Sequence, residues 1–185
     1  MANDDLFGKR DHEEDYFRKQ DRELIERMRK AAAENEARER TGIQDPALLR
    51  DLSALGFTAD TMSLLPLVPI LQVAWADAEV SPDERKLVLE IARHRGIAEG
   101  SLADQQLAAW LTQRPAPSVF SGAGRLVAAL LAEDSAATKD LSADDLVKYC
   151  ENIAAASGGI LGLAKVSAAE RAAIEQVQHV LKNRQ

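Results

Sequence analysis

Residues 6–28, LFGKRDHEEDYFRKQDRELIERM, carry the side chains that point most directly to a chemical role, and that role is binding. On a helical period of 3.6 residues, Phe17, Leu24 and Met28 fall on one narrow stripe. Arginine side chains flank this stripe, so the segment combines apolar anchors with a charged rim. We therefore expect a helix that docks into a groove of another protein.

The narrowness of the stripe leaves the resting place of this helix open. A stripe of this width cannot anchor a helix in a broad core. The segment is then a solvent-exposed arm, one strand of a helical pair, or an arm folded back onto its own domain. Self-association through the same stripe would give a homo-oligomer. From the residues alone, the binding set is Tyr16, Phe17, Leu24 and Met28, flanked by Arg18 and Arg22.

Catalytic chemistry lacks its usual sequence signals. The chain has no glycine-flanked serine, no phosphate-binding glycine loop and no histidine pair at zinc-ligand spacing. Cys150 is the lone cysteine, which excludes an intramolecular disulfide and a cysteine metal cage and favours a reducing compartment. We expect Cys150 to be a buried small hydrophobe and the protein not to be an enzyme.

Composition limits the classes of partner. The 185 residues have a formal net charge of -7 and a pI near 5.1, which argues against nucleic acid because phosphate binding needs clustered Lys and Arg. The longest apolar run, Leu64 to Ala76, is interrupted by two prolines and is shorter than the roughly 20 residues that span a bilayer. The polar N-terminus lacks the apolar run of a signal peptide, so we expect a cytoplasmic protein without direct membrane insertion.

The chain divides by composition near residue 41. From Asp4 to Arg40 there are 12 acids and 10 bases, whereas the rest alternates helical patterns with capping and stop signals. This predicts a charged amphipathic helical arm over 1–40, a hinge over 41–45 and an all-helical domain over 46–183. Abundant Ala and Leu with only 4% aromatics favour helices over sheets.

The clearest helix follows VSPDERKLVLEIARHRG, with Ser81 as N-cap, Pro82 at the first helical position and Gly96 as terminator. Similar signals predict further helices at 46–55, 59–78, 102–113, 119–133, 143–156 and 168–182. No convincing strand interrupts them. The predicted fold is a helical bundle with a protruding N-terminal helix.

Part of the chain repeats at an offset of 86 residues. ADAEVSPDERKLVLEIA, from Ala76, aligns with GLAKVSAAERAAIEQVQ, from Gly162. The matched residues are Val80, Ser81, Glu84 and Arg85 in the first copy and Val166, Ser167, Glu170 and Arg171 in the second. A helix, a turn and a capped helix used twice predict a pseudo-symmetric bundle.

Residues 74–97, AWADAEVSPDERKLVLEIARHRGI, resemble the tellurite-resistance TerB-like family, and so does the second copy at 154–174, AAASGGILGLAKVSAAERAAI. The resemblance covers about residues 46–183. It implies an all-helical, non-enzymatic domain linked to stress response and to assembly with membrane-associated or multi-protein systems.

The same resemblance implies a cation site. The acidic cluster of the family, proposed to engage metal ions, maps onto Asp77, Glu79 and Glu84, and carboxylates of this kind suit a divalent cation such as calcium. Ala78 stands where the family has glycine. Leu163 and Lys165 replace Asp77 and Glu79 in the second copy, so the site would belong to the first copy.

The arm is similar to the inhibitory region of the mitochondrial ATP synthase inhibitor protein, which inserts a helix into the enzyme's catalytic head. The matching motifs are FGKR at 7–10, the acids at 13 and 14, and YFR at 16–18. The resemblance adds partner-binding residues to the physical set, and the full set is Phe7, Lys9, Arg10, Tyr16, Phe17, Arg18, Leu24 and Met28.

Two main functions are compatible with these observations, beside a metal-ion-sensing stress protein that depends on Asp77, Glu79 and Glu84 converging. The first is a cytoplasmic TerB-like protein, of the stress-response or assembly type, that binds a protein partner through its N-terminal helix. The alternative is a regulator that inhibits a rotary ATP synthase through the arm. The partner is accordingly a stress-response complex or the ATP synthase head.

Overall fold

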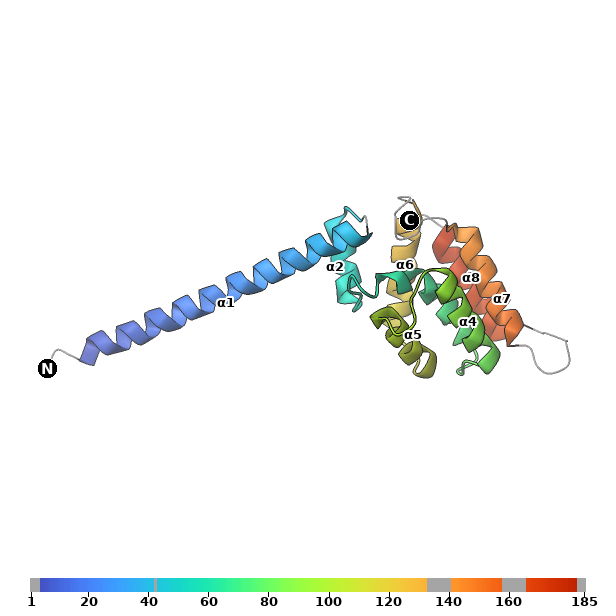
Figure 1. The fold of residues 1–185 in the computed structure, drawn as a ribbon, viewed down its shortest axis with the longest axis horizontal. Helices are drawn as coiled ribbons and strands as arrows, with labels where there is room; N and C mark the ends of the chain where they lie inside the picture. The colour runs from blue at the N-terminus through green and yellow to red at the C-terminus, as the bar shows by residue number, and fades with distance from the viewer. Residues whose placement is uncertain (1–3, 42, 133–140, 158–165, 183–185) are drawn as a thin grey trace.

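The computed structural model describes residues 4–41, 43–132, 141–157 and 166–182, and in its first helix it describes side chains only at 18–36, 38 and 39. All regular structure in these residues is helical, which confirms the predicted all-α class (Figure 1). The elements are α1 (Asp4–Thr41), α2 (Pro46–Ala54), the 3₁₀ helix η1 (Met62–Leu67), α3 (Val68–Ala74), α4 (Pro82–His94), α5 (Leu102–Thr112), α6 (Pro117–Ala132), α7 (Ala143–Ala156) and α8 (Ala168–Lys182).

The core of the bundle forms around α3. This short helix packs against α4, α6, α7 and α8, and its apolar residues, including Ile70, Leu71 and Val73, are fully buried. Each surrounding helix contributes one apolar face, such as Val88 of α4 and Ile153 of α7. Burial of these aliphatic side chains is the main favourable contribution to the fold.

The single helix predicted over 59–78 is wrong. The structure has η1 followed by α3, and Trp75 caps the end of α3. Pro66 and Pro69 explain the division, because proline lacks the N–H that a continuous α-helix needs and disfavours helical geometry at the preceding residue. The other predicted helices are present, with ends that differ by at most two residues.

The second half of the bundle repeats the pattern of the first. Ser81 accepts a hydrogen bond from the Glu84 N–H (3.3 Å) at the start of α4, and Ser167 accepts one from the Glu170 N–H (3.0 Å) at the start of α8. Each glutamate carboxylate in turn accepts from the backbone N–H of its serine, at 2.7 and 2.6 Å. The two predicted caps are therefore both formed, as reciprocal capping boxes.

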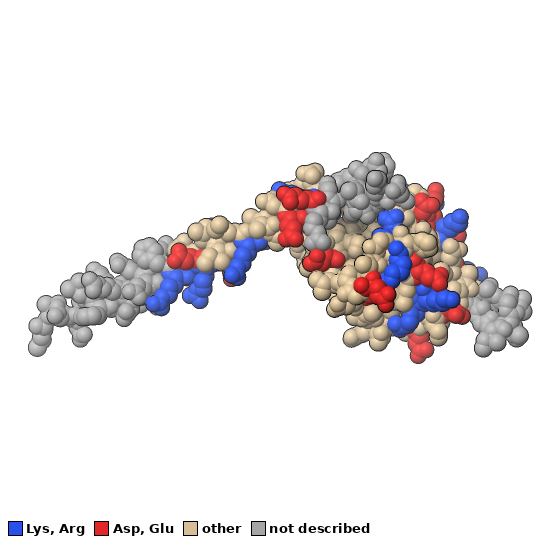
Figure 2. Space-filling model, viewed as in Figure 1, with Lys and Arg blue, Asp and Glu red and all other residues tan. Residues whose placement is uncertain are grey.

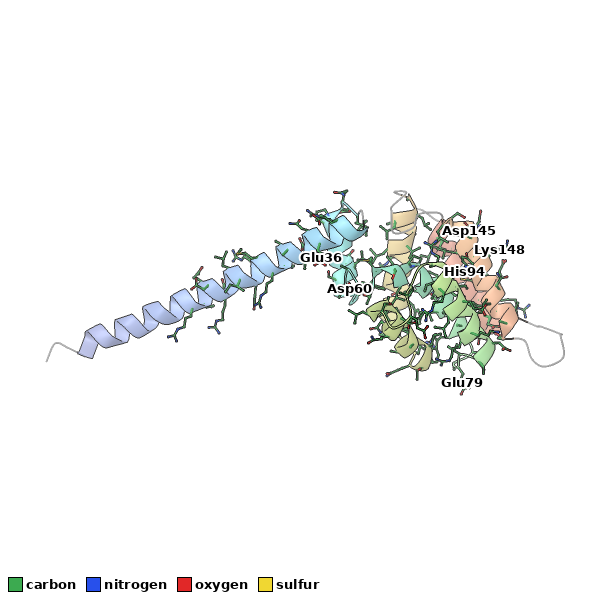
Figure 3. All side chains as sticks on the ribbon, viewed as in Figure 1. Glu36, Asp60, Glu79, His94, Asp145 and Lys148 are labelled. Atoms are coloured by element: carbon green, nitrogen blue, oxygen red, sulfur yellow. The ribbon has the colours of Figure 1, made fainter. Side chains whose placement is uncertain are left out.

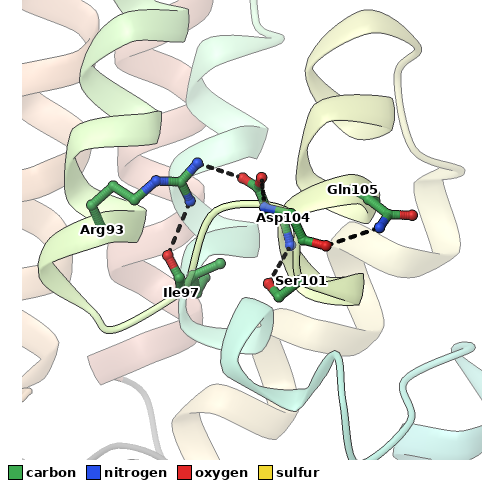
Figure 4. Close-up of polar contacts among 6 residues, drawn as sticks. Arg93, Ile97, Ser101, Asp104 and Gln105 are labelled. Carbon is green, nitrogen blue, oxygen red and sulfur yellow. Dashed lines mark hydrogen bonds and ion pairs between the residues drawn. The ribbon is translucent and has the colours of Figure 1, made fainter.

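A polar cluster fixes the connection between α4 and α5 (Figure 4). Arg93 donates to the Ile97 carbonyl oxygen (3.0 Å) and to Asp104 Oδ1 (2.7 Å), while Asp104 also accepts the Gly100 N–H at 2.8 Å. The hydrogen bond from the Gly100 N–H is the largest cause of a lowered pKa of the Asp104 carboxyl, and the bond from Arg93 adds to it. Gly96, at φ +80, ends α4 in the left-handed conformation that glycine adopts at helix ends.

Helix α1 contacts α2 and extends away from the other helices (Figure 1). The predicted protruding charged helix is therefore present. The division into arm, hinge and domain stays a prediction, but two hinge residues have defined roles. Ile43 is buried (1% exposed), and Asp45 accepts the Ala47 N–H (2.8 Å) as the N-cap of α2.

Candidate functional site

The described part of α1 carries the largest group of exposed apolar side chains. Leu24, Ile25 and Met28 are 56%, 47% and 64% exposed. Among the described residues, Leu102 is the other large hydrophobic residue with such exposure, and it lies apart on α5. Three large apolar side chains within five residues of one helix form a surface that could dock against another protein. We call Leu24, Ile25 and Met28 the α1 stripe.

Charged side chains border the stripe. Arg27 pairs with Glu23 at 3.8 Å, one helical turn apart, and Arg22 Nε donates to the Arg18 carbonyl oxygen at 3.2 Å. Blue side chains follow one edge of α1 in Figure 2. Such exposed pairs contribute little to stability, so the charges are available to form the rim of an interface.

The predicted partner-binding residues all lie on α1, and the structure describes the side chains of three of them. Arg18, Leu24 and Met28 are exposed on α1. The side chains of Phe7, Lys9, Arg10, Tyr16 and Phe17 lie outside the described residues, although their backbone belongs to α1. Their role in binding stays a prediction.

The acidic turn between α3 and α4 does not assemble the predicted metal site. Asp77 and Glu79 are exposed, and Glu79 lies at the outer edge of the bundle in Figure 3. Glu84 is 3% exposed and directs its carboxylate to the Ser81 N–H. Within the parts of the chain described, no three His, Cys, Asp or Glu side chains are grouped so that they could hold a metal ion. Glu84 serves the cap of α4 in this structure, and a cation bound by Asp77, Glu79 and Glu84 stays a prediction.

Residue 78 has an unusual backbone conformation. Ala78 adopts φ +69, the left-handed region that favours glycine. Glycine is the residue that the resembled family has here. The turn therefore keeps the shape that a glycine would give it, at a conformational cost borne by Ala78.

Asp77 links the two capped turns. Its Oδ1 accepts a hydrogen bond from Ser167 Oγ at 2.9 Å, across 90 positions of sequence. Ser157, at the end of α7, donates to the carboxylate of Glu170, which is 1% exposed. These contacts join the end of α3 and the end of α7 to the start of α8.

Sequence reasoning missed this network. It identified Ser81 as a cap and matched Ser167 and Glu170 to Ser81 and Glu84, but it assigned no role to Ser157 and no partner to Ser167 outside its own helix. The 86-residue repeat was the available signal, because the bond between Asp77 and Ser167 joins the two repeated turns.

The electrostatics of the network act on Glu84. Burial raises the pKa of the Glu84 carboxyl, hydrogen bonds from Ser81 oppose that shift, and the negative charges of Glu170 and Asp77 add to it. The folded protein thus favours protonation of this group relative to the unfolded chain.

Cys150 and His94 lie within helices of the bundle. Cys150 is buried, as predicted, and burial raises the pKa of its thiol to about 12, which keeps the thiol protonated and unreactive at neutral pH. His94 lies in the last turn of α4 (Figure 3), where a cation favours the helix dipole.

Three comparisons with known proteins give no relative. No protein-family model matches the sequence, and neither the curated proteins nor the solved structures contain a significant match. The resemblances to the TerB-like family and to the ATP synthase inhibitor protein remain predictions. Among the described residues, no helix is both long enough and apolar enough to cross a membrane.

Proposed function

We propose that the chain is a non-enzymatic, cytoplasmic TerB-like protein that binds a protein partner through α1. The observation that carries this proposal is the exposure of Leu24, Ile25 and Met28 on a helix that extends from the bundle. An apolar stripe with charged borders suits a hydrophobic groove, because the stripe leaves water while the charges remain at the rim.

The other large apolar side chains support this assignment by contrast. The bundle buries Leu64, Leu65 and Ile70 completely, so its sequence does not leave apolar residues exposed at random. The predicted binding residues Phe7, Lys9, Arg10, Tyr16, Phe17 and Arg18 would extend the same interface toward the start of α1.

Site-specific photo-crosslinking tests the proposal. A photoreactive amino acid at position 24 or 28 should form adducts with a partner in native cytosol. The same group at Glu26 or Lys30 should not, because a step of about 100° per residue places both on the opposite face. Equal adducts from both faces would contradict docking through the stripe.

The identified partner then allows a quantitative test. With purified components, Leu24→Ala combined with Met28→Ala should weaken binding by roughly 30-fold, the loss typical of two anchors at an interface. Leu102→Ala, an exposed apolar change on α5, serves as the matched control and should leave the affinity unchanged.

The length of α1 favours a second candidate function. Its 38 residues form one helix that includes the FGKR and YFR motifs, and an inhibitor that inserts a helix into the ATP synthase head needs such a helix. Inhibition of ATP hydrolysis by purified enzyme heads, lost after Tyr16→Ala and Phe17→Ala, would establish this alternative. Unchanged hydrolysis with excess protein would exclude it.

A further inference from the structure

A groove lined by α3, α6 and α8 lies outside the binding surface proposed above. It has a volume of about 630 Å³. Its apolar part includes Phe120 and Val177, which are 6% and 4% exposed. Gln72 of α3 donates to Gln176 of α8 at 3.0 Å across it. The groove therefore combines apolar and hydrogen-bonding surface between three helices.

The charge of this groove is opposite to that of the whole chain. Arg114 and Arg125 belong to its lining, and none of its described lining residues is Asp or Glu. The chain as a whole has 30 acids and 23 bases. Arg114 lies over the Phe120 ring, 5.8 Å from the centroid, so a positive charge stands directly beside the apolar surface. A ligand with carboxylates next to an aromatic group would match both features.

The same chain supplies a segment with this chemistry. Residues 4–17 of α1, DDLFGKRDHEEDYF, contain six acids and two bases together with Leu6, Phe7, Tyr16 and Phe17. We call this segment the acidic tip. Its excess negative charge complements the two arginines of the groove, and its aromatic residues could provide an anchor for the apolar surface.

In the structure the acidic tip lies far from the groove of its own chain. Helix α1 has 38 residues, which corresponds to roughly 57 Å at 1.5 Å per residue. Its N-terminal end lies at the opposite end of the molecule from α8 (Figure 1). We propose that the acidic tip of one copy docks into the α3–α6–α8 groove of a second copy, with carboxylates of the tip paired to Arg114 and Arg125.

This contact has a consequence for regulation. The docked tip is withdrawn from any foreign partner that would use Phe7 or Tyr16, so self-association competes with partner binding. The contact is head-to-tail and closes into a dimer only if both copies exchange tips; otherwise it extends into longer assemblies. It involves neither Leu24 nor Met28 and does not depend on the proposed function.

Charge reversal on full-length protein tests the proposal. One variant carries Arg114→Glu and Arg125→Glu, and a second carries Glu13→Lys, Glu14→Lys and Asp15→Lys. Each variant alone should weaken self-association by at least about tenfold in sedimentation equilibrium, because like charges then face each other. An equimolar mixture should restore association, since each groove then meets a tip of opposite charge.

Matched controls separate this effect from a general change in charge or stability. Arg50→Glu with Lys148→Glu, on α2 and α7, reverses the same number of exposed charges outside the groove and should leave association unchanged. Circular dichroism should show that all variants are folded. High salt should weaken the wild-type assembly.

Three results would overturn the proposal. Wild-type protein that stays monomeric up to millimolar concentration would exclude self-docking and would leave the groove for an acidic segment of another protein. Association that survives both reversals but is lost after Leu24→Ala with Met28→Ala would assign self-association to the α1 stripe. Reversed variants that fail to associate when mixed would exclude the pairing of tip with groove.

Discussion

At the scale of single residues, Glu84 makes a capping hydrogen bond at a position where burial and nearby negative charges disfavour its own charge. Its carboxylate is needed to accept the Ser81 N–H, yet it is 3% exposed and lies near the negative charges of Glu170 and Asp77. Capping requires an oxygen acceptor but does not require a charge. Capping and charge can therefore be separated by substitution.

Glu84→Gln should make the stability of the protein less dependent on pH. The folded state raises the pKa of Glu84, so the folded protein binds this proton more tightly and wild-type stability falls as pH rises from the ordinary value through the raised one. Glutamine keeps an acceptor for Ser81 and removes the charge. Above the raised pKa, the variant should have a larger free energy of unfolding than wild type. This difference should disappear below the ordinary pKa of a glutamate.

Urea unfolding followed by tryptophan fluorescence from pH 4 to pH 8 measures this difference. Glu84→Ala, which also removes the acceptor, should destabilise by about 1–2 kcal/mol across the range. Glu90, which is exposed on the same helix, provides the control. Glu90→Gln should not show a gain in stability that is present at high pH and absent at low pH. A Glu84→Gln advantage that grows at low pH would contradict the assigned cause.

At the scale of elements, the turn between α3 and α4 is held in a conformation that its sequence does not favour. Ala78→Gly should stabilise the protein by roughly 0.5–1 kcal/mol, because glycine adopts positive φ without the steric cost that alanine bears, and part of that gain is lost to the greater freedom of the unfolded chain. Chemical denaturation measures the difference. A lower midpoint would show that Ala78 makes contacts that outweigh its strain.

Ala98→Gly provides the comparison for this element. Ala98 is exposed in the turn between α4 and α5 and does not have positive φ. Glycine there adds freedom to the unfolded chain without relieving strain, so this variant should be slightly less stable than wild type. Opposite signs at positions 78 and 98 would assign the gain to the backbone conformation.

The elements also separate what the sequence could predict from what it could not. Ser81, Pro82 and Gly96 determine α4 through contacts within a few residues, and such local signals predicted nearly all helix ends. The division of η1 from α3 was missed because the apolar run outweighed Pro66 and Pro69 in the prediction. The sequence shows that Asp77, Glu79 and Glu84 are near one another along the chain, but it does not show that the Glu84 carboxylate is directed to the Ser81 N–H and away from a common site with the other two.

At the scale of the whole molecule, local sequence patterns could not predict the contacts that join the two repeats. The bond between Asp77 and Ser167 connects residues 90 positions apart, and the groove between α3, α6 and α8 depends on how three helices assemble. The α1 stripe was predictable because its residues are neighbours on one helix. Surfaces made by one element follow from sequence periodicity, whereas surfaces between elements require the fold.

The Asp77–Ser167 bond should therefore couple the two halves energetically. Asp77→Ala removes the acceptor, and Ser167→Ala removes both this bond and the cap of α8, so the single changes are not equivalent. A double-mutant cycle separates the shared part, and we expect a coupling energy of about 0.5–1 kcal/mol for one partly exposed hydrogen bond to a carboxylate. Chemical denaturation of the four proteins gives this value.

The same cycle with Ser142→Ala, which caps α7 without contacting Asp77, should be additive within about 0.5 kcal/mol. Additivity in both cycles would mean that the repeats are held together by apolar packing around α3 and that the bond between the turns contributes nothing measurable.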